Sequence, residues 1–318
     1  MEGFAGRTVR FAQLSAGTAD GIERPDSSDY GVIETDPALT LLVRDPLNIF
    51  YIGMNRDFAP FDDMRVRQAM AMAVNRQRIV DLFFPEKSLV ADQFLPPAMF
   101  GYSEDPGWYE HDPVAAGSLL ADAGYPEGFD LTLNYRDVER RYLPAPELVA
   151  AEIAVQLSAI DIDVTIEVMD SGPFVEATQA GEIPFYLLGW TVDWPDPTNM
   201  LDFHFGPQSV QFGAGFPDLW DVLTAARSTT DTSTRLALYQ EATALIKQHA
   251  PMIPVAHAAD AVAYQADVTG AHASPTGVER FAVMNPAGRA ELVFTEVAEP
   301  SGLYCGDESD GPSLSACA

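Results

Sequence analysis

Two short segments of alternating apolar and polar residues flank a helical pattern, and this feature constrains the fold most. The alternating apolar positions are Phe129, Leu131, Leu133 and Tyr135, and later Ile162, Val164, Ile166 and Val168. The apolar residues between them recur at helical spacing, at Val149, Ile153, Leu157 and Ile160. A strand, a helix and a strand in this order form a βαβ unit, whose strands are parallel with a right-handed crossover. The chain is therefore predicted to belong to the α/β class.

The stretch 185–199 has the composition of a strand that ends at a binding site. Phe185 to Leu188 is an apolar run, followed by glycine, two tryptophans, two prolines and two aspartates. Ligands of open α/β sheets bind beyond the carboxyl ends of the strands, where an indole can form a flat wall and a carboxylate can hold a cation. A proline-stiffened surface turn with solvated aspartates has the same composition, so this segment alone leaves both interpretations open.

Basic residues follow the first strand of the βαβ unit. The loop 136–142 contains three arginines, and it opens at the carboxyl end of the predicted sheet. If the strand at 185–190 is parallel to the strand at 129–135, the loop that contains Asp193 opens on the same edge. A basic loop and an acidic, aromatic loop beside one crevice suit a ligand that carries both charges.

Two sequence blocks resemble the solute-binding proteins of peptide-type ABC importers (family 5 extracellular solute-binding proteins), which include dipeptide, oligopeptide and nickel binders. The segment 189–199 reads Gly-Trp-Thr-Val-Asp, then Asp-Pro-Thr-Asn, and is similar to the family pattern Gly-Trp-x-x-Asp-x-x-Asp-Pro-x-Asn. Asn55 and the segments 60–69 and 73–76 resemble the pattern Asn-x(n)-Pro-Phe-Asp-x-x-x-Val-Arg-Gln-Ala-x(n)-Ala-x-x-Arg. The similarity extends from about Ala16 to about Pro286 and corresponds to the later part of the family's chain.

The resemblance implies a periplasmic-binding-protein fold of type II. One α/β lobe, 49–256, would bind the ligand, and a second lobe would be present in part, at 1–48 and 257–300. Residues 301–318 would be an acidic tail with a cysteine pair. The implied function is to capture a peptide or related small solute and present it to the permease subunits of an ABC importer, with no bond chemistry and no cofactor. A non-transporting peptide sensor or chaperone-like binding module, or less favourably a hydrolase, remains an alternative.

The resemblance also assigns the ligand's α-ammonium group to Asp193, which stands three residues after Trp190 as the family's carboxylate does. Thr191 would support this carboxylate, and Trp190 would shield it from water. Asp196 is the competing carboxylate, but its position before Pro197 is typical of an aspartate whose side chain bonds its own turn. Asp193 is therefore predicted to contact the ligand and Asp196 to stabilise the turn.

Arg140 is the residue to which the resemblance assigns the ligand's carboxylate. The segment 138–144, which also places Tyr142 in the site, is similar to the arginine-containing segment of dipeptide-binding relatives. A guanidinium group offers a carboxylate a bidentate fork that lysine cannot match. Arg141 is adjacent, so the register is open by one residue, and a salt bridge to a neighbouring acidic residue is an alternative role.

The charge balance limits the partners. The chain has 318 residues, of which 18 are Lys or Arg and 47 are Asp or Glu, giving a formal net charge of -29. Such a surface repels nucleic-acid phosphates and anionic lipids, so no nucleic-acid partner is expected. No apolar run approaches the roughly 20 residues that span a bilayer. Membrane contact is expected only through the permease or through a lipid anchor outside this sequence.

The two ends of the chain bear on its location. Met1 to Gly3 has neither a basic start nor an apolar segment, so it is not a signal peptide and, alone, indicates the cytoplasm. Family members carry an export signal and a large first portion, so the resemblance implies a periplasmic or extracytoplasmic protein of which this chain is a fragment. Cys305 and Cys317 fit no metal or redox spacing. A disulfide between them suits an exported protein, and two free thiols are the alternative.

Motifs for bond chemistry are missing from the sequence. It contains no G-x-S-x-G, H-E-x-x-H, P-loop or G-x-G-x-x-G, and none of its five histidines stands at ligand spacing from another histidine or cysteine. Nickel-binding relatives make a metal conceivable, but no residues specify a metal site. His257 is a candidate to face the ligand cleft, and a structural histidine is the alternative.

Capping signals locate the helices. Asp62 or Asp63 can begin a helix whose apolar stripe runs to Ile79, with Arg67 and Arg76 as structural partners for carboxylates. Further helices are predicted from Pro113 to Gly124 and near 218–226 and 233–249, and further strands at 48–54 and 253–257.

Overall fold

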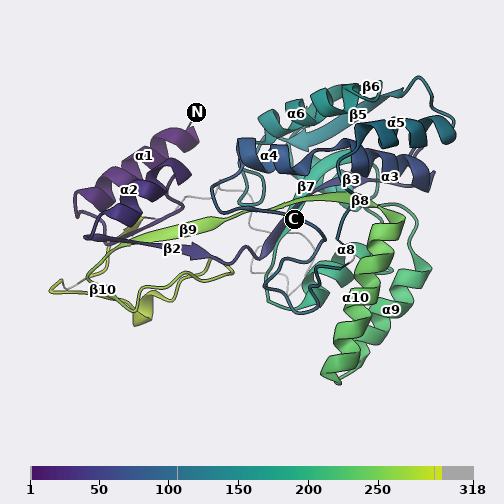
Figure 1. Cartoon of the computed structure of the whole chain (residues 1–318). Coiled ribbons are helices and arrows are strands. Elements are labelled where there is room, and N and C mark those ends of the chain that lie inside the picture. The colour runs from purple at the N-terminus through teal and green to yellow at the C-terminus, as the bar shows by residue number, and fades with distance from the viewer. Residues whose placement is uncertain (1, 106, 290, 296–318) are drawn as a thin grey trace. The chain divides into compact units, whose positions relative to one another are not determined.

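The computed structural model describes residues 2–105, 107–289 and 291–295, in a chain that divides into two compact units (Figure 1). The first unit combines both ends of the chain, Met1–Asp45 and Ala259–Ala318, and the second is Pro46–Ala258. Cys305 and Cys317, predicted to form a disulfide, lie outside the described residues.

A mixed sheet of six strands forms the centre of the second unit, in the order β4-β8-β3-β7-β5-β6. Its strands are β3 (Asn48–Met54), β4 (Leu89–Val90), β5 (Phe129–Arg136), β6 (Ile162–Met169), β7 (Phe185–Thr191) and β8 (Met252–His257). β3 is antiparallel to β7 and β8, whereas β5 is parallel to β6 and β7. The predicted βαβ unit is therefore confirmed, and α6 (Pro146–Ser158) is its crossover helix.

Burial explains the two strand patterns of the sequence. Every residue of β3 is buried, and β7 is buried from Phe185 to Trp190, because both strands lie inside the sheet. Strands that are covered on both faces read as continuous apolar runs. β6 is the last strand of the sheet, and most of its residues are at least partly exposed, so its sequence alternates.

The helix predicted from Asp62 or Asp63 to Ile79 is in fact two helices, α3 (Met64–Ala73) and α4 (Arg76–Phe83). Asp63 caps the first by accepting a hydrogen bond from the backbone N–H of Arg65. Val74 then leaves the helical region at φ -85° and ψ 117°. Asn75 caps the second helix by accepting from the N–H of Arg78 at 2.9 Å. The apolar stripe continues across this break, which is why its spacing predicted one helix.

The carboxylate partner predicted for Arg76 is present, whereas that predicted for Arg67 needs correction. Arg67 is buried and donates to carbonyl oxygens rather than carboxylates, including that of His249 at 2.9 and 2.7 Å. Arg76 donates to the carbonyl of Ala91 and has one carboxylate, that of Asp92, at 3.4 Å. Both arginines therefore bind carbonyl oxygens that, among the described residues, have no partner within their own loop or helix end, a role that sequence spacing does not reveal.

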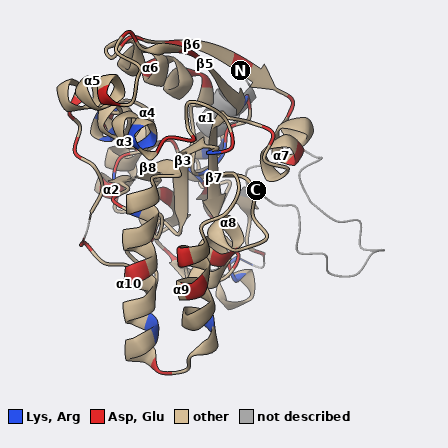
Figure 2. Ribbon diagram, turned by 90° about the vertical axis from the view of Figure 1, so that its right-hand side faces the viewer, with Lys and Arg blue, Asp and Glu red and all other residues tan. Residues whose placement is uncertain are grey.

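The helices predicted from Pro113 to Gly124 and near 218–226 and 233–249 are confirmed as α5 (Pro113–Asp122), α9 (Pro217–Ser228) and α10 (Thr232–His249). Asp112 caps α5 by accepting from the next two free N–H groups. The other helical elements are α7 (Ser171–Gln179), a π-helix (Thr198–Asp202) and α8 (Phe203–Phe205). α9 and α10 pack side by side as a hairpin, and acidic residues are spread over many elements of the chain (Figure 2).

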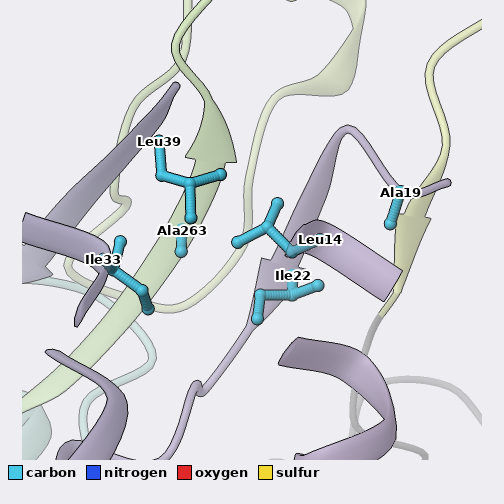
Figure 3. Packing of buried hydrophobic residues seen from close by; sticks show 6 residues of the cluster. All are labelled: Leu14, Ala19, Ile22, Ile33, Leu39 and Ala263. Carbon is cyan, nitrogen blue, oxygen red and sulfur yellow. The ribbon is translucent and has the colours of Figure 1, made fainter. Parts of the chain in front are cut away.

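The first unit contains a four-stranded sheet in the order β12-β1-β9-β2. Its elements are α1 (Glu2–Ser15), β1 (Gly21–Glu23), a 3-10 turn (Ser27–Asp29), α2 (Tyr30–Thr35), β2 (Leu39–Arg44), β9 (Asp260–Gln265), β10 (Val268–Thr269), a 3-10 turn (Phe281–Val283), β11 (Asn285–Pro286) and β12 (Phe294–Thr295). Figure 3 shows its apolar core, formed by Leu14, Ala19, Ile22, Ile33, Leu39 and Ala263. Among the described residues, none of the helices has the length and apolar character needed to cross a membrane.

Candidate ligand-binding site

Three strands of the second unit end at the same edge of its sheet. β5 and β7 are parallel, so the loops that follow Arg136 and Thr191 leave from one edge. β8 is antiparallel to β3, as β7 is, and therefore also ends there, at His257. The condition set by the sequence, that the basic and the acidic loops share an edge, is met.

Asn199 organises the acidic loop. Its Oδ1 accepts hydrogen bonds from the indole Nε1 of Trp190 at 3.1 Å and from the backbone N–H of Asp193 at 2.9 Å. Its Nδ2 donates to Oδ2 of Asp193 at 3.0 Å. Asn199 is buried, whereas Asp193 is exposed. One amide thus fixes both the backbone and the carboxylate of Asp193 in an orientation that faces solvent.

Asp196 stabilises the turn, as predicted. Its Oδ1 accepts from the backbone N–H and the hydroxyl of Thr198, at 3.0 and 2.7 Å. Nη2 of Arg235 lies 2.9 Å from both carboxylate oxygens, which ties the turn to α10. Partial burial acts to raise the pKa of this carboxyl, but the bonds from Thr198 and Arg235 outweigh it, so the pKa lies below its ordinary value.

The aromatic residues of the acidic loop differ in exposure. Trp190 is only 4% exposed, and its ring stacks on that of Phe203 with centroids 4.5 Å apart. Trp194 is 42% exposed, and Phe203 is 36% exposed. The tryptophan that the sequence places as a wall is therefore mostly covered, and the surface beside Asp193 presents Trp194 instead.

Tyr142 packs the basic loop against β7. Its hydroxyl accepts a hydrogen bond from Nη2 of Arg136 at 2.8 Å, and Arg136 also donates to Ser171. The ring lies so close to Gly189 that a Cβ atom there would be 2.3 Å from it, so only glycine fits under this ring. Tyr142 is buried, and the basic loop is consequently packed against the strand that leads to Asp193.

The other predicted site residues lie at this edge as well. Arg140 and Leu143 exchange backbone hydrogen bonds of 3.0 Å, which closes a tight turn that contains Arg141. Both arginines are partly buried. Thr191 is partly buried and pairs with Asn48 in the sheet. The register between Arg140 and Arg141, and the ligand contacts of all these residues, stay predictions.

His257 has the contacts of a structural histidine. It is buried, and its Nδ1 donates to the carbonyl oxygen of Asn48 at 2.7 Å. Burial lowers the pKa of His257 to about 4, so the ring is neutral at pH 7. Its Nε2 is buried without a hydrogen-bond partner among the described residues. A ligand role for this nitrogen stays a prediction.

Several residues that shape the site were not identified from the sequence. Trp194, Phe203 and Arg235 act through exposure or through contacts between elements, which local spacing does not reveal. Asn199 belongs to the segment 189–199 that resembles the family pattern, and this was the available signal for its role. The described residues contain no group of three or more metal-ligating side chains close enough to hold a metal ion.

An α/β unit whose strands end in two oppositely charged loops at one edge has the architecture of a type II periplasmic binding protein. The sequence profile described as bacterial extracellular solute-binding proteins, family 5 middle, matches residues 3–212. The chain belongs to this family, and the predicted family and fold are confirmed.

Two related sequences give the scale of the similarity. Heme-binding protein A of Haemophilus influenzae is 32% identical over 280 residues, which cover 86% of this chain and 51% of that protein. The dipeptide-binding protein of Escherichia coli is 28% identical over 280 residues, covering 86% of this chain and 52% of that protein. The chain thus spans about half the length of the curated relatives that it matches.

Solved structures agree with this placement. The structure of HbpA2 from Haemophilus parasuis superposes with a TM-score of 0.81 at 32% identity, covering 88% of this chain and 56% of that one. The dipeptide-binding protein of Pseudoalteromonas sp. SM9913 in complex with Met-Leu superposes with a TM-score of 0.75 at 27% identity, with the same coverage.

Proposed function

We propose that this chain belongs to a solute-binding protein that captures peptides outside the cytoplasm for an ABC importer and catalyses no bond chemistry. The observation that carries the proposal is Asp193, an exposed carboxylate held by Asn199 at the sheet edge where the loop of Arg140 also lies. Relatives named as dipeptide-binding proteins, and a neighbour in complex with Met-Leu, support a peptide as the ligand. The second unit, Pro46–Ala258, would be the ligand-binding lobe.

A free peptide has the two charges that this edge can bind. Asp193 would accept its α-ammonium group, and Asn199 holds that carboxylate in place before the ligand arrives, which lowers the entropy lost on binding. Arg140 would receive the ligand's carboxylate through its guanidinium fork. When closure around the ligand removes this charge pair from water, loss of either charge would cost more binding free energy than it would at the surface.

Calorimetry with Met-Leu and N-acetyl-Met-Leu tests this role. Asp193→Asn should weaken binding of Met-Leu by about two to three orders of magnitude, because it leaves the ammonium without its counter-charge. Asp163→Asn is the matched control, since Asp163 is an exposed aspartate on β6 of the same unit. Equal affinity of wild type and Asp193→Asn, or an acetylated peptide that binds as tightly as the free one, would refute the ammonium role.

The same assay resolves the arginine register. Arg140→Ala should weaken Met-Leu binding while Arg141→Ala leaves it near the wild-type value. The opposite result would move the assignment to Arg141. Peptide amides, which lack the carboxylate, should bind wild type and Arg140→Ala equally.

The importer role is tested separately from binding. Cells that lack the gene should lose uptake of labelled dipeptide and regain it on complementation. Binding without any effect on uptake would favour a peptide sensor or a chaperone-like module. Release of free amino acids from Met-Leu by the purified chain would favour a hydrolase.

A further inference from the structure

We propose that Trp194 selects ligands whose first residue carries an aromatic side chain, so that the preferred ligands are peptides with an aromatic amino terminus. This inference rests on the proposed function and adds the substrate class. Its starting point is exposure: Trp194 is 42% exposed, while Trp108 and Trp190 in the same unit are 5% and 4% exposed. A half-exposed indole next to an exposed carboxylate offers apolar surface where the ligand's charge is expected.

The backbone holds Trp194 firmly. Pro195 follows it and restricts its backbone to extended conformations. The carbonyl oxygen of Trp194 accepts from the N–H of Asp196 at 2.8 Å, and Arg235 anchors Asp196 to α10. On the other side, Asn199 holds the N–H of Asp193. Because the loop is fixed at both ends, the indole can contact a ligand with little loss of chain entropy.

The chemistry of a peptide places its first side chain beside this indole. In an α-amino acid the side chain and the ammonium group share one carbon atom, so an ammonium bound at Asp193 brings the first side chain next to the neighbouring residues of the loop. The chain bends at 193–196, which keeps Trp194 at the site instead of continuing the strand away from it. An aromatic side chain can pack on the indole in an offset or edge-to-face geometry.

Phe203 is a second partly exposed aromatic residue that contacts the acidic loop. Its partly exposed ring stacks on Trp190, whose indole N–H bonds to the asparagine that also holds Asp193.

The test compares three dipeptides, Phe-Ala, Ala-Phe and Ala-Ala, by calorimetry. Wild type should bind Phe-Ala more tightly than Ala-Phe by about two- to tenfold, the range of one added aromatic contact. Trp194→Ala should abolish this difference while still binding Ala-Ala, and Trp194→Phe should retain most of it. Phe281→Ala, which removes a similarly exposed ring from the first unit, is the control and should leave the difference unchanged.

A second readout follows the indole itself. Phe-Ala should protect wild type from acrylamide quenching, and the protection should be missing in Trp194→Phe. If wild type and Trp194→Ala prefer Phe-Ala over Ala-Phe equally, the inference is overturned. Binding of Ala-Ala by both proteins would in that case still support the proposed function. An equal loss of all three peptides in Trp194→Ala, with an unchanged circular dichroism spectrum, also overturns it. Failure of wild type to bind any of the peptides overturns the proposed function and this inference together.

Discussion

Replacing Asn199 by alanine should destabilise the second unit and disorder its acidic loop. The side chain is 3% exposed and makes three hydrogen bonds: it accepts from the backbone N–H of Asp193 and the indole N–H of Trp190, and it donates to the carboxylate of Asp193. Among the described residues, no other side chain forms hydrogen bonds with both Trp190 and Asp193. The substitution therefore removes the hydrogen bond that orients the carboxylate of Asp193 and the one that satisfies the buried indole N–H of Trp190.

The magnitude follows from which groups can turn to water. Asp193 is exposed, so its N–H and carboxylate regain solvent, and each lost bond should cost about 0.5–1 kcal/mol. The indole N–H of Trp190 is buried, and leaving it unpaired should cost about 1–3 kcal/mol. The expected total is about 3 kcal/mol of unfolding free energy.

Urea unfolding followed by tryptophan fluorescence measures this cost for the second unit alone. All four tryptophans of the chain, at 108, 190, 194 and 220, lie within Pro46–Ala258. Gln208→Ala is the control, because Gln208 is an exposed residue of the same unit and its replacement should change the unfolding free energy by less than about 0.5 kcal/mol. A cost below about 0.5 kcal/mol for Asn199→Ala would show that the three bonds do not hold the loop.

Asn199→Asp sharpens the test. It keeps the Oδ1 acceptor for Trp190 but faces the carboxylate of Asp193 with a second carboxylate in place of an amide donor. It should therefore be less stable than wild type at pH 7 and recover part of the difference near pH 4, where protonation restores a donor. A variant whose deficit is the same at both pH values would contradict the assigned geometry.

Three further predictions concern the same unit. Burial raises the pKa of Asp202 from 3.8 to about 6, so its charged form lowers stability progressively from about pH 4 and fully above about pH 6; because solvent screening reduces this effect and the substitution also removes the ion pair with Arg227, Asp202→Asn should stabilise the unit at pH 7 by about 1 kcal/mol, and no gain in urea unfolding would contradict this. Burial lowers the pKa of His204 to about 3 and of His257 to about 4, so the stability that each neutral ring provides is complete above about pH 6.5 and falls by about 1.4 kcal/mol per pH unit below it. Replacing both histidines by glutamine should flatten the acid side of the stability profile, and an unchanged slope would refute the assignment. Gly189→Ala should cost about 1–3 kcal/mol of stability, because its Cβ would lie 2.3 Å from both the backbone oxygen of Ile49 and the ring of Tyr142, and a wild-type melting temperature would contradict this close packing.

The sequence predicted the parts of the fold that depend on local periodicity and capping. Alternation identified β5 and β6, helical spacing identified α6, and their order required the parallel pairing that the sheet shows. Asp112 before Pro113 located a helix start to the residue. These features are local, since each depends on side chains within a few positions of one another.

The features that the sequence did not predict depend on contacts between distant segments. The first helix ends at Val74, whose backbone is extended, although the apolar stripe continues beyond it. The stripe records only which side chains are buried and carries no information on where the backbone leaves the helix. Arg67 binds the carbonyl of His249 from another helix. Exposure follows the same rule: Trp190 lies on the buried strand β7 and stacks on Phe203, whereas Trp194 lies beyond the end of that strand and is 42% exposed.

The discontinuous first unit has a consequence for the order of folding. Its sheet pairs β2 with β9, which are synthesised before and after the whole second unit, so no nascent chain can form this pair until residue 265 has emerged. The loop-closure entropy for such a pair depends on the length of the disordered chain between its strands. Once the second unit has folded, the chain between β2 and β9 is mostly ordered. The side chain of Asn48 then bonds both the carbonyl and, at 2.9 Å, the N–H of Ala258, so the two ends of that ordered segment lie together. β2 and β9 are then connected to neighbouring residues, so folding of the second unit brings these two strands of the first unit together. In refolding experiments, tryptophan fluorescence should therefore recover before β2 and β9 acquire protection from hydrogen exchange.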